Sequence, residues 1–85
     1  MTVRLQSHIK VTKVEGGSVI LDEQSGQYWQ MNSTAATALD ILLDKGSVEA
    51  AATTLAESYD VDAEQARSDV ESLLASLRSA SLVVE

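Results

Sequence analysis

The chain contains no cysteine and only one histidine, and these two shortages exclude several kinds of site. Without cysteine there is no disulfide framework, no thiol nucleophile and no thiolate ligand for a metal ion. The single histidine, His8, lies in an expected strand and forms no nucleophile–base pair or zinc site by itself. The sequence therefore predicts no catalytic residue, no metal site, no cofactor and no enzymatic activity. A reducing compartment fits the absence of cysteine, and we expect a cytoplasmic protein.

Positive charge is also scarce. Lys and Arg together number 6, against 13 Asp and Glu, and the formal net charge is −7. Binding to phosphates or to an anionic membrane surface requires basic side chains, which release counterions or provide Coulomb attraction. The N-terminus has no long apolar run, so neither a signal peptide nor a transmembrane helix is expected. The sequence predicts that neither a nucleic acid nor a membrane is a partner.

The length of 85 residues allows one domain with one modest core. Hydrophobic residues make up 45% of the chain, which is normal for a globular protein. We therefore expect residues 1–85 to form a single domain, with strands over about 3–31 and helices over about 33–80.

The first part of the chain has the period of β-strands. Val3, Leu5, Ile9 and Val11 are all at odd positions, so residues 3–14 are expected to form one strand with a single apolar face. Turns containing glycine, at residues 15–18 and 22–26, separate this segment from two further short strands. Those strands are predicted over residues 19–21 and 27–31. Two turns this short imply an antiparallel three-stranded meander.

From Asn32 onward the period changes to 3.6, and three helices are expected. The first covers about Ser33 to Lys45, with Asn32 or Ser33 as its cap and Gly46 at its end. The second begins at Ser47, and the third follows Asp62, with Gln65 completing a capping box. Their expected inner faces contain Ala35, Leu39, Leu42, Leu43, Val48, Ala52, Leu55, Tyr59, Ala63, Ala66, Val70, Leu73, Leu74 and Leu77. The apolar tail 82–84 is expected to pack back onto the core. The predicted fold is α+β and winged-helix-like: a three-stranded antiparallel meander followed by a three-helix bundle.

The third strand is the first candidate site. In a meander it has a partner on one side only, and an exposed edge is a place where an extended peptide adds as a strand. Tyr28 and Gln30 are expected to face one way, and Trp29 and Met31 the other, toward the helices. Trp29, the only tryptophan, is either a core residue or the wall of a groove beside the strand.

An acidic residue within the third helix is the second candidate. Asp69 lies one step from the apolar stripe formed by Ala66, Val70 and Leu73. It is either a rim carboxylate in water or an acceptor at the edge of a groove, where a charge-assisted hydrogen bond to a ligand is stronger than a neutral one.

The order and spacing of several short motifs resemble a known family. The motifs are Leu21-Asp22, Gly26-Gln27-Tyr28, Met31-Asn32-Ser33-Thr34-Ala35, Leu55-Ala56-Glu57-Ser58-Tyr59-Asp60, Asp69-Val70, Leu73-Leu74 and Leu77. Together they cover nearly the whole chain and resemble the PqqD-like family, the small precursor-recognition elements of ribosomally made, post-translationally modified peptides (RiPPs). Within it, the chain is most similar to the discrete proteins of lasso-peptide biosynthesis. Because it ends soon after residues 82–84, we expect a free-standing member.

The resemblance implies a non-catalytic protein that binds the leader region of a precursor peptide by strand addition to the third strand. The residues it implies for this site are Tyr28, Trp29, Gln30, Met31, Ala66, Asp69, Val70 and Leu73. Leaders of lasso systems typically carry a Tyr, whose hydroxyl is expected to meet Asp69 or a neighbour. Met31 stands where the family usually has Leu, a change that should keep the packing. The implied partners are a leader peptidase of cysteine-protease type and, less directly, an ATP-dependent cyclase, and the implied state is a monomer.

Two other classes remain as alternatives. A winged helix is also compatible with DNA binding through the third helix, although Glu64, Asp69 and Glu71 outnumber Arg67 and Arg78 there and would repel phosphates. A dimerisation module that uses the same strand edge is the other alternative.

Overall fold

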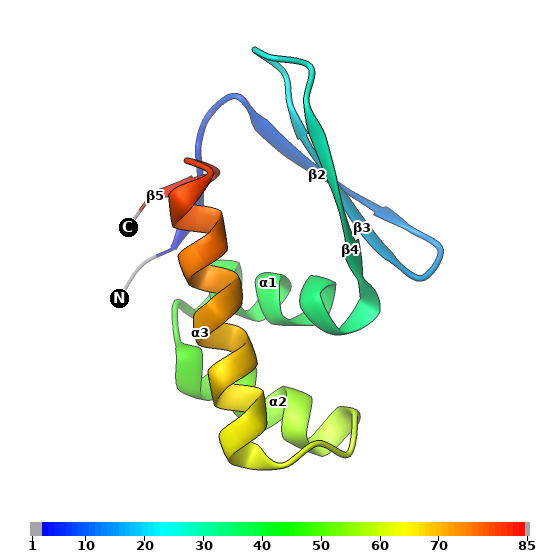
Figure 1. Ribbon diagram of the computed structural model, residues 1–85, viewed down its shortest axis with the longest axis vertical. Helices are drawn as coiled ribbons and strands as arrows, with labels where there is room; N and C mark the ends of the chain where they lie inside the picture. Colours follow the sequence, from blue (N-terminus) through cyan, green and yellow to red (C-terminus); the bar gives the residue numbers. More distant parts are fainter. Residues whose placement is uncertain (1–2, 85) are drawn as a thin grey trace.

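The computed structural model describes residues 3–84, in which a small antiparallel sheet stands above a layer of three helices (Figure 1). The elements, in chain order, are β1 (Arg4–Leu5), β2 (Ile9–Val14), β3 (Gly17–Asp22), β4 (Tyr28–Asn32), α1 (Ser33–Lys45), α2 (Val48–Ser58), α3 (Ala63–Ser79) and β5 (Val83–Val84). The strands β2, β3 and β4 pair antiparallel in that order. The predicted α+β fold, with a meander followed by three helices, is confirmed.

The expected first strand over residues 3–14 is wrong as a single element. It divides into β1 and β2 because the chain turns between them, where the Ile9 N–H donates to the Gln6 carbonyl at 3.0 Å. His8 therefore lies in a turn and not in a strand. β1 pairs antiparallel with β5, and the Gln6 N–H donates to the Leu82 carbonyl at 3.0 Å. The apolar tail thus packs back as predicted, but as a strand whose partner is at the other end of the chain.

The first two helices begin at local capping residues. The Asn32 side chain accepts a hydrogen bond from the Ala35 N–H at 2.9 Å, and Ser47 accepts one from the Ala50 N–H at 3.1 Å. Gly46 ends α1 in the left-handed conformation, with φ of 63°, which glycine adopts without steric cost. Because Asn32 is also the last residue of β4, the cap fixes the direction in which the strand leads into the helix.

The capping box predicted at the start of α3 does not form. Asp62 occupies the N-cap position, but its side chain makes no cap hydrogen bond. The Gln65 amide instead donates, through Nε2, to Oδ1 of Asp69 at 2.8 Å, one turn further along the helix. A carboxylate acceptor at the i+4 position competes well for this side chain because the bond is charge-assisted.

The core lies between one face of the sheet and the three helices. Side chains from the sheet and from each helix are buried there, and each buried Val, Leu or Ile contributes about 1.5–3 kcal/mol relative to an exposed position. The buried cluster consists of Val3, Ile9, Ile20, Ala38, Leu39, Leu42, Ala51, Ala52, Leu55, Ala66, Val70, Leu74, Leu77, Leu82 and Val83. The predicted stripes of the helices supply most of it.

A few residues of those predicted stripes are not buried in the core. In α1, Ala35 and Leu43 are only half-buried, while Ala36 and Ala38 are buried. The reason is that α1 contacts β3 and β4 as well as α2, so its buried face is wider than a single stripe. Ala63, in the first turn of α3, is exposed.

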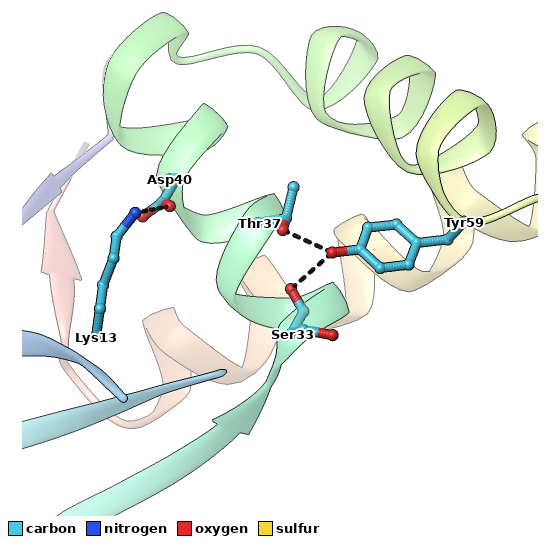
Figure 2. A network of polar contacts seen from close by, with 5 residues as sticks. All are labelled: Lys13, Ser33, Thr37, Asp40 and Tyr59. Atoms are coloured by element: carbon cyan, nitrogen blue, oxygen red, sulfur yellow. Dashed lines mark hydrogen bonds and ion pairs between the residues drawn. The ribbon is translucent and has the colours of Figure 1, made fainter. Parts of the chain in front are cut away.

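Polar contacts tie the sheet and α2 to α1 (Figure 2). The Lys13 ammonium of β2 pairs with Asp40 of α1 at 2.8 Å. Tyr59, predicted on the inner face of α2, is 37% exposed, and its hydroxyl lies 2.9 Å from the Thr37 hydroxyl and donates to the Ser33 carbonyl at 3.3 Å. This phenol therefore connects the end of α2 to the start of α1. A phenol with a polar tip favours such a half-exposed place.

Candidate functional site

The edge of β4 is open in the described part of the chain, because β4 pairs with β3 on one side and with no strand on the other. Its side chains alternate as predicted. Trp29 and Met31 are half-buried and pack against the core, whereas Tyr28 is 66% exposed and Gln30 is exposed. An extended segment that added to this edge would continue the same alternation.

Two hollows lie along the line between β4 and α3, and we call them together the β4–α3 groove. The first encloses about 240 Å³ beside Trp29 and Met31, and the second about 190 Å³ beside the start of α1. The first is lined by Ile20, Trp29, Gln30, Met31, Leu73, Ser76, Leu77, Ala80 and Leu82. The second is lined by Asn32, Thr34, Ala35, Ala38, Leu55, Asp69, Val70 and Leu73. Leu73 lines both, so its side chain separates them.

Asp69 lies at the edge of the second hollow. It is exposed, and Oδ1 accepts the hydrogen bond from Gln65, which leaves the rest of the carboxylate able to accept further bonds. The two interpretations of this residue from the sequence meet here, because it is a rim carboxylate and also a groove residue.

The structure brings together most of the residues predicted for the site. Trp29, Met31 and Leu73 meet in the first hollow, and Asp69, Val70 and Leu73 in the second. Val70 is fully buried and belongs to the floor. The remaining predicted residues differ in orientation or depth.

Three predicted residues present no side chain to the groove. Ala66 has 0% of its surface exposed and belongs to the core behind the groove. The side chains of Tyr28 and Gln30 are on the opposite face of the sheet from Trp29 and Met31, so these two offer the groove only their backbone.

Several lining residues were not predicted. Ser76 of α3 and Ala80, which caps its end, follow Leu73 by three and seven positions. This is the helical spacing of one face, so the signal was present in the sequence. Thr34, Ala35 and Leu55 come from α1 and α2. Their place depends on how those helices pack, which the period of the sequence does not reveal.

The hairpin that leads into β4 is held by Asp22. Its Oδ1 accepts hydrogen bonds from the Gln24 N–H at 2.9 Å and from the Ser25 N–H at 3.3 Å. Partial desolvation raises the pKa of the Asp22 carboxyl, but these bonds outweigh it. Aided by the Ser25 hydroxyl and the charge of His8, they hold the pKa below its ordinary value. Asp22 therefore has a structural role in the turn before the edge strand β4.

Neither metal chemistry nor a membrane span is suggested by residues 3–84. Within this range no three His, Cys, Asp or Glu side chains gather so that they would hold a metal ion. None of the helices described there is both long and apolar enough to span a membrane.

Comparisons with known proteins give one family model and two similar solved structures. The family model described as coenzyme PQQ synthesis protein D (PqqD) matches residues 17–83. A solved structure titled "Lasso peptide synthetase B1 complexed with the leader peptide" superposes with a TM-score of 0.91 at 35% identity, and the match covers 100% of both chains. None of the curated proteins matches this chain significantly.

A second solved structure, "TbiB1 in Complex with the TbiA(beta) Leader Peptide", superposes with a TM-score of 0.80. That match covers 98% of this chain and 94% of the other, at 20% identity, and it supports the fold alone. The family model covers more than half of the chain, and the resemblance predicted from the motifs is confirmed. This chain belongs to the PqqD family.

Proposed function

We propose that this protein binds the leader region of a ribosomally made precursor peptide of the lasso type, by strand addition to β4. The observation that carries the proposal is an open strand edge directly beside an apolar groove. The same fold, at 35% identity over the whole chain, occurs in a protein solved together with a leader peptide.

The groove suggests how affinity and specificity would be divided. Backbone groups of β4 would pair with the backbone of the leader and supply affinity that does not depend on sequence. Every second leader side chain would enter the groove, against Trp29 and Met31 in the first hollow and Val70 in the second. Leu73 would touch side chains in both hollows. Asp69 would accept a hydrogen bond from a donor on the leader, such as a Tyr hydroxyl.

We further propose that the protein is a non-catalytic, single-domain monomer that acts in the cytoplasm. It would present the leader to a leader peptidase of cysteine-protease type and, less directly, to an ATP-dependent cyclase. This part of the proposal is supported by the family and by the lack of cysteine, which leaves no thiol nucleophile in the chain.

A proline on each edge of the sheet tests strand addition. Gln30 of β4 and Thr12 of β2 both lie opposite Val19 of the central strand, so they are at the same level on the two edges. Gln30→Pro removes a backbone donor and disturbs the β4 edge, and we expect leader affinity to fall at least about tenfold. Thr12→Pro is the control on the other edge. Because the Thr12 N–H faces β3, this change should cost more stability than Gln30→Pro but have little effect on the leader affinity of the folded protein.

Calorimetric titration with synthetic leader peptides measures both variants, and thermal melts show whether they fold. A folded Gln30→Pro variant that binds leader as tightly as wild type would contradict strand addition. A wild-type protein that binds no leader would contradict the proposed function itself.

A further inference from the structure

The sheet has a second exposed surface, which we call the outer sheet face: the side of β2, β3 and β4 turned away from the helices. Two rows of residues, paired across the strands, form its centre. They are Lys10, Leu21 and Tyr28, and Thr12, Val19 and Gln30. Tyr28 is 66% exposed and Leu21 is 38% exposed, and Val14, on the same side of β2, is 47% exposed. Within residues 3–84 the only other exposed large apolar side chain is that of Tyr59, in the helical layer.

This face also lacks acidic side chains, although the chain has a net charge of −7. Glu15 and Glu23 lie in the turns at its two ends, and Asp22 is paired with buried Ile9 on the opposite face. Every other acidic residue of the described range follows β4 in the chain, in the helices and their linkers. Lys10 is the one charged residue of the two central rows. An aromatic and aliphatic centre without carboxylates is the composition of a protein–protein contact surface.

The outer sheet face is continuous with the β4 edge. A leader strand added to that edge would lie about 4.8 Å from β4 and widen the sheet by one strand. The leader side chains that do not enter the groove would then project outward beside Tyr28 and Gln30. A protein that covers this face would contact both this protein, which we call the carrier, and the bound peptide.

We propose that the outer sheet face docks the enzyme that processes the bound peptide, and this inference rests on the function proposed above. The enzyme would place apolar side chains on Leu21 and Tyr28 and a carboxylate near Lys10. Charge favours such a partner over a second copy of this chain, because the same face of another copy has no carboxylate to offer Lys10. Since peptide and carrier form one surface, the enzyme would dock on the loaded carrier better than on the empty one.

Two substitutions away from the leader edge test the proposal. Leu21→Thr removes the apolar centre of the face while keeping a residue that favours strands, and Lys10→Glu reverses its charge. Ala75→Glu, on an exposed position of α3 outside both hollows, is the matched control for adding a carboxylate. The probe is the cysteine-type leader peptidase produced from the same biosynthetic genes, acting on its precursor peptide at increasing carrier concentration.

We expect all three variants to bind synthetic leader within about twofold of wild type by calorimetry. The carrier concentration that gives half the maximal cleavage rate should rise at least about fivefold for Leu21→Thr and for Lys10→Glu. It should stay unchanged for Ala75→Glu. If Leu21→Thr does not fold in thermal melts, Lys10→Glu decides alone.

Cleavage like that of wild type in the folded variants would overturn the proposal, as would equal impairment by Ala75→Glu. A dimer of the wild-type chain that Leu21→Thr dissociates would assign the face to a second copy and overturn it as well. The calorimetric titration contains no peptidase, so absence of leader binding by wild type is recognised separately. That result would overturn the proposed function and this inference with it.

Discussion

Asp69 has the position of a recognition residue, because its carboxylate is at the edge of the groove and only partly used by Gln65. Asp69→Asn keeps the size of the side chain and removes its charge. If a leader donor bonds to this carboxylate, the change should weaken leader binding by about 1–2 kcal/mol with little effect on folding. Calorimetric titration measures the difference. Gln65→Ala is the control, since it removes the intramolecular donor and should leave leader affinity equal or higher. An unchanged affinity of Asp69→Asn would make this residue a rim carboxylate in water.

Substitutions of Leu73 and of its neighbour Leu74 distinguish an effect on leader binding from an effect on folding. Leu73 is half-buried between the two hollows, whereas Leu74 is 3% exposed and belongs to the core. We expect Leu73→Ala to weaken leader binding by about 1–3 kcal/mol, because interface energy concentrates in such anchors, at some cost in stability. Leu74→Ala should instead lower the free energy of unfolding by about 2–5 kcal/mol and spare the affinity of the folded fraction. Denaturant unfolding and calorimetry measure the two quantities. Equal effects of both changes on binding would place the site elsewhere.

Which side chains line the groove was predictable only where the signal is local. The alternation along β4 correctly separated Trp29 and Met31 from Tyr28 and Gln30, because a strand repeats every two residues. Helical spacing also marked one face of α3, but it did not give depth along that face. Ala66 is therefore buried although it shares the stripe with the groove residue Leu73.

The hairpin between β3 and β4 gives a prediction about pH. The pKa of Asp22 is lower in the folded protein than its ordinary value. Its hydrogen bonds therefore stabilise the fold at pH values above that ordinary pKa. This contribution is lost as the pH falls through the folded pKa, in the region below about pH 4. Asp22→Asn keeps a turn acceptor but does not titrate. Thermal melts from pH 7 to strong acid should show a lower melting temperature for the variant at pH 7, with a difference that shrinks on acidification. A difference independent of pH would contradict this role.

The elements themselves were predicted best where both ends are set by adjacent residues. The bounds of α1 match the prediction because Asn32 and Gly46 act within one turn of the helix. The division of the first strand was not predictable from the period, since Val3 and Ile9 are both buried whether they share a strand or not. What divides them is the pairing of β1 with β5, a contact between the two ends of the chain that no local pattern encodes.

For the whole molecule, the distribution of charge argues against the DNA-binding alternative. α3, which would enter the major groove, carries Glu64, Asp69 and Glu71. Its Arg67 forms ion pairs with Glu49 of α2 and, at 3.8 Å, with Glu71. Contacts to phosphates would have to break these pairs and overcome the repulsion of the remaining acids. A leader peptide that adds to an uncharged strand edge meets no such cost.

The dimerisation alternative uses the same edge of β4, and a measurement on the intact protein separates it from leader binding. We expect the free chain to sediment as a monomer and the loaded chain as a one-to-one complex. Leader at 100 times its Kd should stabilise the fold by about 2.7 kcal/mol, because it binds the folded state only. For a domain of this size, that corresponds to a rise in melting temperature of about 10–20 °C. Gln30→Pro should lose most of this rise and Thr12→Pro should keep it, since only the former changes the β4 edge. The opposite result would be a free chain whose measured mass doubles as its concentration rises, forming a dimer that dissociates when leader is added. That result would show that two copies pair through β4. The open edge would then be covered in the absence of peptide, and leader binding would have to compete with self-association.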